Sequence, residues 1–194
     1  MRIERGILGV TTLGPLSRFG IWTNGCGRNC PGCVSKRLQK SNPSTEIEVT
    51  AFLNQFDLSH SDGVTISGGE PFDQASELHR LVQALREKGF EDILIYTGYT
   101  IEELRGKHDE DIDYVLAEVA ALVDGPYVEA LNDDTGNLYG SSNQRFFLFK
   151  EKFAPRYNAY MRSTRRMQEF IVGDYYVGVG IPTHAYIDDF NGRR

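Results

Sequence analysis

The sequence has few cysteines, no long apolar run and no excess of positive charge. Its three cysteines, Cys26, Cys30 and Cys33, are an odd set confined to one short window, which excludes a fold held together by intrachain disulfides. No apolar run approaches the about 20 residues that cross a bilayer. The net charge of −6 argues against a protein that grips nucleic acid through its phosphates, because such proteins are usually basic.

The first residues also lack the pattern of a secretory signal. Charged side chains come early in MRIERGILGV, and Thr-Thr-Leu-Gly-Pro follows before an apolar core develops. We therefore expect a cytoplasmic protein that binds neither nucleic acid nor a membrane. Its 194 residues, of which 40% are hydrophobic and 25% charged, have the composition of a globular domain.

Short apolar runs alternate with helical periodicity from residue 19 to residue 124. Strands are expected at 19–23, 63–67, 92–97 and 121–124, and helices at 51–57, 73–88, 101–104 and about 112–119. Thr50 and Thr100 are the expected N-caps of the first and third helices, and Gly89 is expected to end the second. Strands separated by helices indicate parallel pairing with right-handed crossovers. The predicted fold class is therefore α/β, either a partial (β/α) barrel or an open, mostly parallel sheet with crossover helices. A complete eight-fold barrel would need about 250 residues.

The pattern changes after Gly125. Residues 126–144 are polar and predict a long loop, and long loops inside compact domains are usually functional or disordered. Further β segments are expected at 145–149, 168–172 and 176–179, with a basic, aromatic stretch between the first two. We divide the chain into a core domain, residues 1–145, and a β-containing C-terminal extension, residues 146–194, packed on the core. The basic stretch either docks an acidic partner or shields a sheet edge.

The cysteines stand in one glycine-rich loop with the spacing C-x3-C-x2-C. Glycines let the backbone turn tightly around sulfur atoms, so the loop suits a metal centre. Structural zinc takes four ligands, whereas the nearest histidine, His60, is distant in the sequence. A 4Fe–4S cluster normally takes four cysteines, so three would leave one iron open to a substrate or cofactor. Zinc completed by a distant histidine and three buried apolar thiols are the alternatives.

A second feature follows the strand expected at 63–67, where residues 67–71 read Ser-Gly-Gly-Glu-Pro. Ligands of parallel sheets bind beyond the carboxyl ends of the strands. Two glycines at that position would let a ligand approach the backbone, and Glu70 would offer a carboxylate to a cation such as an amino group. A plain strand exit that leads into the next helix is the alternative.

Together the two motifs resemble those of the radical S-adenosylmethionine (SAM) enzymes. In that superfamily three cysteines hold a 4Fe–4S cluster, SAM chelates the fourth iron, and a Gly-Gly-Glu segment contacts the SAM amino group. The implied metal ligands are Cys26, Cys30 and Cys33, and the implied cofactor-binding residues are Ser67, Gly68, Gly69 and Glu70. The reduced cluster would split SAM into methionine and a 5′-deoxyadenosyl radical that abstracts a hydrogen atom. Because oxygen destroys such chemistry, an anaerobic setting is implied too.

Further motifs resemble one branch, the anaerobic ribonucleotide reductase activating proteins. The chain has Tyr-Thr-Gly-Tyr at 96–99, Asp-Gly-Pro at 124–126 and Gly-Ser-Ser-Asn-Gln-Arg at 140–145, in the family order. The resemblance implies that the protein generates a glycyl radical on a larger partner, a glycyl radical enzyme, using a low-potential electron donor such as flavodoxin or ferredoxin. Tyr96 and Asp124 become candidates for contacts near the SAM nucleoside. Plain packing for Tyr96 and a simple turn at Asp124 are the alternatives.

Three functions remain open on the sequence. The first is a glycyl radical activating enzyme, the second a radical SAM enzyme that modifies a peptide or small molecule, and the third a non-enzymatic metal-binding adaptor. No side chain is assigned as an additional catalytic residue, and the chain has no further cysteine for an auxiliary cluster. Asn143, Gln144 and Arg145 either pin the polar loop or face a partner chain.

Overall fold

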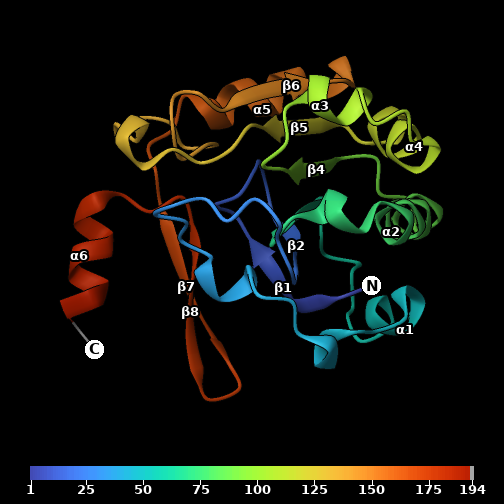
Figure 1. The fold of residues 1–194 in the computed structure, drawn as a ribbon, viewed down its shortest axis with the longest axis horizontal. Helices are drawn as coiled ribbons and strands as arrows, with labels where there is room; N and C mark the ends of the chain where they lie inside the picture. Colours follow the sequence, from blue (N-terminus) through green and yellow to red (C-terminus); the bar gives the residue numbers. More distant parts are fainter. Residues whose placement is uncertain (193–194) are drawn as a thin grey trace.

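A six-stranded mixed sheet forms the centre of the computed structural model, which describes residues 1–192 (Figure 1). The strands lie in the order β1-β2-β3-β4-β5-β6. Their bounds are β1 Ile3–Val10, β2 Arg18–Thr23, β3 Gly63–Gly68, β4 Ile93–Tyr96, β5 Ala121–Asp124 and β6 Arg145–Leu148. Strands β2 to β5 pair in parallel, and β1 and β6 pair antiparallel at the two edges. The predicted α/β class with a mostly parallel sheet is confirmed.

Helices connect the parallel strands and cover one face of the sheet. The crossovers contain η1 Lys36–Leu38, η2 Pro43–Thr45, α1 Val49–Leu53, η3 Pro71–Gln74, α2 Ala75–Glu87, α3 Ile101–Arg105 and α4 Glu110–Glu118. Buried apolar residues of the four α-helices join those of β2, β3, β4 and β5 in one core cluster. Consecutive strands are neighbours, so right-handed crossovers place these helices on the same side. Within residues 1–192, every helix is too short or too polar to cross a membrane.

Helix boundaries follow the predicted signals in part. Thr100 caps α3 through a capping box, and Gly89 follows α2 with a φ of +90°, both as expected. The predicted cap at Thr50 is wrong, because the side chain of Glu48 accepts the first N–H groups of α1. The helix predicted from residue 73 begins as an α-helix only at Ala75, after a 3-10 turn that starts at a proline.

The opposite face of the sheet is covered by the chain that follows β5. This part contains η4 Glu129–Leu131, η5 Glu151–Phe153, α5 Ala154–Met161, the hairpin of β7 Met167–Val172 and β8 Tyr175–Gly180, and α6 His184–Gly192. Tyr157 of α5 packs on β4 and β5, and Val179 of β8 packs on Ile7 and Val10 of β1. Figure 1 shows the hairpin extending past β1 and β2, with α6 on its outer side.

The boundary predicted between residues 145 and 146 lies at the start of β6, which pairs with β5 in the main sheet. The division into a core and an extension stays a prediction. Residues 193 and 194, the end of that predicted extension, lie outside the described residues.

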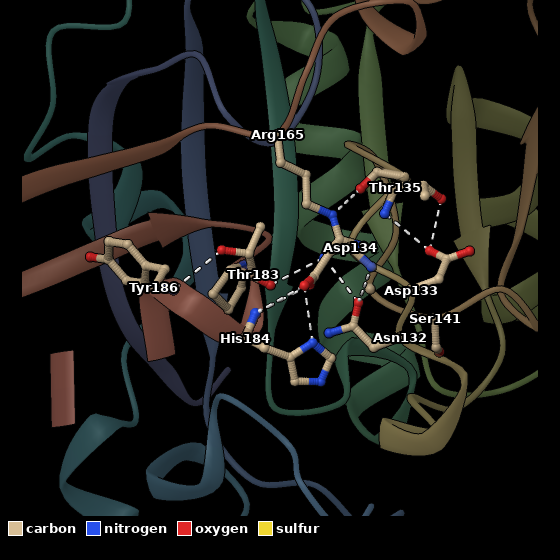
Figure 2. A network of polar contacts seen from close by, with 12 residues as sticks. Asn132, Asp133, Asp134, Thr135, Ser141, Arg165, Thr183, His184 and Tyr186 are labelled. Carbon is tan, nitrogen blue, oxygen red and sulfur yellow. Dashed lines mark hydrogen bonds and ion pairs between the residues drawn. The ribbon is translucent and has the colours of Figure 1, made fainter. Parts of the chain in front are cut away.

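A polar network ties the loop predicted at 126–144 to the extension (Figure 2). The Arg165 side chain, which is 5% exposed, donates to the side chains of Asn132 and Asp134 and to the Pro182 carbonyl. Asp134 also accepts the backbone N–H of His184 at the start of α6. The loop is therefore held against the C-terminal segment by charged and backbone groups together.

A buried ion pair stabilises the sheet beneath α5. The Arg18 and Asp92 side chains are 0% and 1% exposed, with Nη1 and Oδ2 3.0 Å apart. Arg18 also donates to the Thr65 hydroxyl, and the Tyr157 hydroxyl donates to Asp92 over 2.7 Å. Both charged side chains therefore have several hydrogen-bond and ion-pair partners, which offset the cost of removing them from water.

Replacing Arg18 by methionine should destabilise the fold strongly, because it leaves the Asp92 carboxylate buried with less compensation. Breaking a buried pair in this way costs about 3–5 kcal/mol. Arg80→Met is the matched control, since Arg80 is 66% exposed beside Glu77 and its loss should cost less than about 1 kcal/mol. Urea unfolding followed by circular dichroism measures both free energies. Equal losses would refute a special role for the buried pair.

Candidate metal and cofactor site

The cysteine loop begins at the carboxyl end of β2. Cys26, Cys30 and Cys33 are all free thiols and all partly buried. The tight turns of the loop use three residues with a positive φ, namely Gly25 at 94°, Asn29 at 49° and Gly32 at 73°. Glycine adopts this conformation without the strain that a Cβ introduces, so the loop can fold closely around a bound group.

The Gly-Gly-Glu segment lies against the start of this loop. The Gly69 N–H donates to the Thr23 carbonyl over 2.8 Å and the Glu70 N–H donates to the Gly25 carbonyl over 2.9 Å. A Cβ on Gly68 would lie 2.3 Å from the Thr23 nitrogen, and one on Gly69 would lie 2.2 Å from the Gly25 oxygen. The two glycines are expected to let a ligand approach the backbone. In the structure, the backbone of Thr23 and Gly25 already occupies the space that a Cβ on either glycine would need.

The carboxylate of Glu70 points into the protein, where the residue is 1% exposed. Its Oε1 accepts the Phe72 N–H and the Thr97 hydroxyl, and its Oε2 accepts the Gly98 N–H over 2.7 Å. Burial raises the pKa of Glu70 to about 7. The side chain therefore links the end of β3 to the Tyr-Thr-Gly-Tyr motif after β4, and its contact with an amino group stays a prediction.

Asp73 binds the cysteine loop directly, although none of the sequence motifs includes it. Its Oδ2 accepts the Gly27 N–H and its Oδ1 accepts the Tyr99 hydroxyl, each over 2.7 Å. The Arg28 guanidinium lies 4.8 Å from the centre of the Tyr99 ring. The sequence signal that could have identified Asp73 was its position in the first turn after the Gly-Gly-Glu segment, next to a strand end where ligands bind.

The other predicted cofactor residues have partners of their own. The Asp124 carboxylate, which is 0% exposed, accepts the Arg145 guanidinium over 2.5 Å and the Ile101 N–H over 2.7 Å. The Ser67 carbonyl accepts the Thr23 hydroxyl. The Tyr96 hydroxyl is buried and finds no hydrogen-bond partner in the part of the chain that the structure describes. Among the described residues, Tyr96 thus keeps an unpaired hydroxyl on the face of the sheet that α5 and the β7–β8 hairpin cover, whereas the Asp124 carboxylate is already bonded within the protein.

The polar loop reaches the cysteine loop at another point. The Glu129 carboxylate lies so close to Gly32 that a Cβ there would be 2.6 Å from its Oε2. Asn143 and Gln144 donate to the carbonyls of Pro126 and Gly125. Of the two roles left open for Asn143 and Gln144, the structure shows the pinning of the loop.

The thiols suit an iron–sulfur cluster. No three His, Cys, Asp or Glu side chains among residues 1–192 converge as a single metal ion would require, but a cubane binds each cysteine through a different iron and holds the thiolates farther apart. Burial raises the pKa of the Cys26 thiol, and backbone N–H bonds from Arg28 and Asn29 oppose that rise. Burial raises the pKa of Cys33 as well, against an N–H bond from Ser35. Such N–H groups also stabilise bound thiolates.

Similarity to known proteins identifies the family. The sequence pattern described as a 4Fe-4S single cluster domain matches residues 12–147. The anaerobic ribonucleoside-triphosphate reductase-activating protein of Salmonella typhimurium is 34% identical over 140 residues, which cover 68% of this chain and 88% of that protein. The chain belongs to the radical SAM activating-enzyme family. Its cluster is accordingly of the 4Fe–4S kind, and this activating enzyme is an oxidoreductase.

Two further relatives agree with this assignment. The anaerobic ribonucleoside-triphosphate reductase-activating protein of Escherichia coli K12 is 32% identical over 139 residues, 68% of this chain and 88% of that protein. The pyruvate formate-lyase-activating enzyme of Staphylococcus aureus is 29% identical over 154 residues, 74% of this chain and 59% of that enzyme. Residues 148–194 of the activating enzyme lie beyond the 4Fe-4S family match, which ends at residue 147.

Gly69→Ala should disrupt the site, whereas Gly27→Ala should be tolerated. A methyl group on residue 69 meets the fixed Gly25 carbonyl at 2.2 Å, while one on residue 27 first meets the Asp73 side chain at 3.3 Å. Overpacking against backbone costs about 1–3 kcal/mol, so the free energy of unfolding of Gly69→Ala should fall by that amount. Its iron content after anaerobic reconstitution should fall as well. If both variants bind iron like the wild type, the contact between the two backbones does not hold the site.

Proposed function

We propose that this activating enzyme holds its 4Fe–4S cluster through Cys26, Cys30 and Cys33, binds SAM at the open iron, and generates a glycyl radical on a larger partner enzyme. The contact of the cysteine loop with the Gly-Gly-Glu segment carries the proposal. A ligand of the open iron would lie beside the backbone of Gly68 and Gly69, which already touches the loop. The names of the relatives favour anaerobic ribonucleoside-triphosphate reductase as the partner.

The bound cluster and SAM would supply the radical chemistry: one electron from a low-potential donor such as flavodoxin or ferredoxin would split SAM into methionine and a 5′-deoxyadenosyl radical, which would take a hydrogen atom from a glycine Cα. The chain's own residues bind and orient. Glu70 holds its segment in place through Thr97 and Gly98, and Asp73 fixes the loop at Gly27. The buried Tyr96 hydroxyl, without a protein partner among residues 1–192, is available to a polar group of the nucleoside.

The surroundings of the site fit this chemistry. Sequential strand order with helices on one face favours a partial (β/α) barrel, whose inner face would carry the reaction. On that face α5 and the β7–β8 hairpin pack against the sheet and would exclude water from a radical. Three reduced thiols and oxygen-sensitive chemistry suit the cytoplasm of an anaerobically growing cell, where we place the protein.

A radical SAM enzyme that acts on a peptide or small molecule is the second candidate. The observation in its favour is that α5 and the β7–β8 hairpin, which lie beyond the 4Fe-4S family match, cover the inner face of the sheet. An extension at that place would select what reaches the radical. The third interpretation of the sequence, a non-enzymatic adaptor, finds no support, because the family is one of enzymes.

An isotope transfer experiment tests the proposal. The reconstituted wild type is mixed anaerobically with dithionite, SAM and the anaerobic reductase of the same genome, prepared with glycine deuterated at Cα. We expect deuterium in the 5′-deoxyadenosine and a glycyl radical signal on the reductase in electron paramagnetic resonance. 5′-Deoxyadenosine without deuterium, and no signal on the reductase, would favour the second candidate.

Cys30→Ala should lose most of its iron and all SAM cleavage in the same assay, with its circular dichroism retained. Without Cys30 only two thiolates remain in the loop, which is too few to anchor a cluster that takes three protein ligands. His60→Ala is the control, because His60 is the nearest histidine in the sequence to the cysteine loop and the one that a zinc site would recruit first. Undiminished cleavage by Cys30→Ala would overturn the ligand assignment.

A further inference from the structure

Charge is distributed unevenly around the cysteine loop. Residues 24–45 include four basic residues and no Asp or Glu, in a chain with a net charge of −6. Arg28 is one of the four, and it forms an ion pair with Glu103 over 3.2 Å. The other three, Lys36, Arg37 and Lys40, follow Cys33 closely and are exposed. We refer to these three residues as the basic patch.

The basic patch has no acidic partner in the part of the chain that the structure describes. The ion pairs found among residues 1–192 involve none of its three residues. The carboxylates near the cysteine loop approach other points of it, since Asp73 binds Gly27 and Glu129 lies against Gly32. Acidic groups therefore approach the loop just after its first cysteine and just before its last, and the positive charge of the basic patch follows the last cysteine.

Backbone hydrogen bonds fix the basic patch relative to the metal ligands. Lys36 and Arg37 lie in η1, whose third residue, Leu38, is buried. The Leu38 carbonyl accepts the Gly25 N–H over 2.8 Å, and the next carbonyl accepts the Cys26 N–H over 2.9 Å. A protein bound to the patch would thus lie beside the cluster.

We propose, on the basis of the proposed function, that the basic patch is the docking surface for an acidic one-electron carrier protein. Each turnover consumes one electron, which the carrier loses and the cluster gains, so the carrier has to dock next to the cysteines. A net charge of −6 repels an acidic protein from most of the surface. A local positive patch then both raises the association rate and selects the orientation in which the carrier arrives.

The position of the basic patch favours the electron carrier over the radical-accepting partner. The partner's glycine has to reach SAM, on the side of the Gly-Gly-Glu segment. The chain after the patch instead runs along the start of β1, at the edge of the sheet. There Arg2 pairs with Glu46 in an isolated antiparallel bridge, and the Ile47 N–H donates to the Met1 carbonyl over 2.9 Å. The two proteins would use different parts of the surface and could bind in one turnover.

The charge-reversal variant Lys36→Glu/Arg37→Glu/Lys40→Glu tests the docking surface. The probe is photoreduced flavodoxin, an acidic carrier, mixed with the reconstituted holoprotein while the absorbance of the cluster is followed in a stopped-flow instrument. The wild-type rate constant should fall steeply as salt rises to about 0.2 M, where the Debye length is below 10 Å. The variant should react about 10-fold or more slowly at low salt, with little salt dependence.

A matched control reverses three exposed basic residues elsewhere. Arg80→Glu/Lys88→Glu/Arg105→Glu changes the net charge by the same amount, but these residues lie in α2, just after α2 and at the end of α3. Its rate should stay within about 3-fold of the wild type, because steering depends on where the charge lies. Equal slowing by both triple variants would show that only net charge matters and would overturn the proposal.

Assays with dithionite distinguish a failure of the docking proposal from a failure of the proposed function, because this reductant needs no docking surface. With this small reductant, the wild type and the patch variant should bind equal iron and release 5′-deoxyadenosine at equal rates. No 5′-deoxyadenosine from the wild type would overturn the proposed function, and the docking proposal with it. Normal cleavage with an unchanged flavodoxin rate in the variant would overturn the docking proposal alone. A higher KM of the variant for the radical-accepting partner under dithionite, with an unchanged flavodoxin rate, would assign the patch to that partner instead.

Discussion

The close approach of two backbones at the carboxyl ends of β2 and β3 is the constraint on which the site depends. The pairing of these strands continues into the segments that follow them, through Gly69 to Thr23 and Glu70 to Gly25. Neither glycine of the Gly-Gly-Glu segment has room for a Cβ. The first residues of the cysteine loop are therefore fixed against the Gly-Gly-Glu segment. A group held by the thiols of this loop would lie near that segment.

Hydrogen bonds from two carboxylates connect the ends of β2 and β3 to the segment that follows β4. Glu70 ties the segment to Thr97 and Gly98 after β4, and Asp73 ties Tyr99 back to the cysteine loop. Each of these carboxylates thus joins residues from two different crossovers. The arrangement gives a structural reason for three short motifs that are separated in the sequence: they form one continuous set of contacts at the strand ends.

The two faces of the sheet have different tasks. The crossover helices fill one face with an apolar core, while α5 and the β7–β8 hairpin cover the other. Arg165, between α5 and β7 in the sequence, bonds to Asn132 and Asp134 of the polar loop (Figure 2). The sequence predicted β2 to β5 and the main helices, because each is an apolar run or stripe bounded by a clear cap or turn. It did not predict β1, where register shifts around Arg5 and before Val10 break the alternation. Nor did it predict α5, in which Tyr157 is the one residue described as buried.

The site was predictable to the level of motifs but not of side-chain directions. The strands predicted at 19–23 and 63–67 placed the cysteines and the Gly-Gly-Glu segment at strand ends, and the ends of parallel strands share one edge. The inward direction of Glu70 and the pairing of Asp124 with Arg145 depend on partners far away in the sequence, which no local pattern reveals. Asp73 was missed for the same reason, because its bond to Gly27 exists only once the sheet has formed.

The most direct test of the account is electron paramagnetic resonance of the reconstituted, dithionite-reduced protein with and without SAM. An open iron beside the Gly-Gly-Glu segment predicts a cubane signal whose g values change when SAM is added, because a new ligand then binds that iron. A signal that SAM leaves unchanged would mean that no iron is open to it, and would contradict the account.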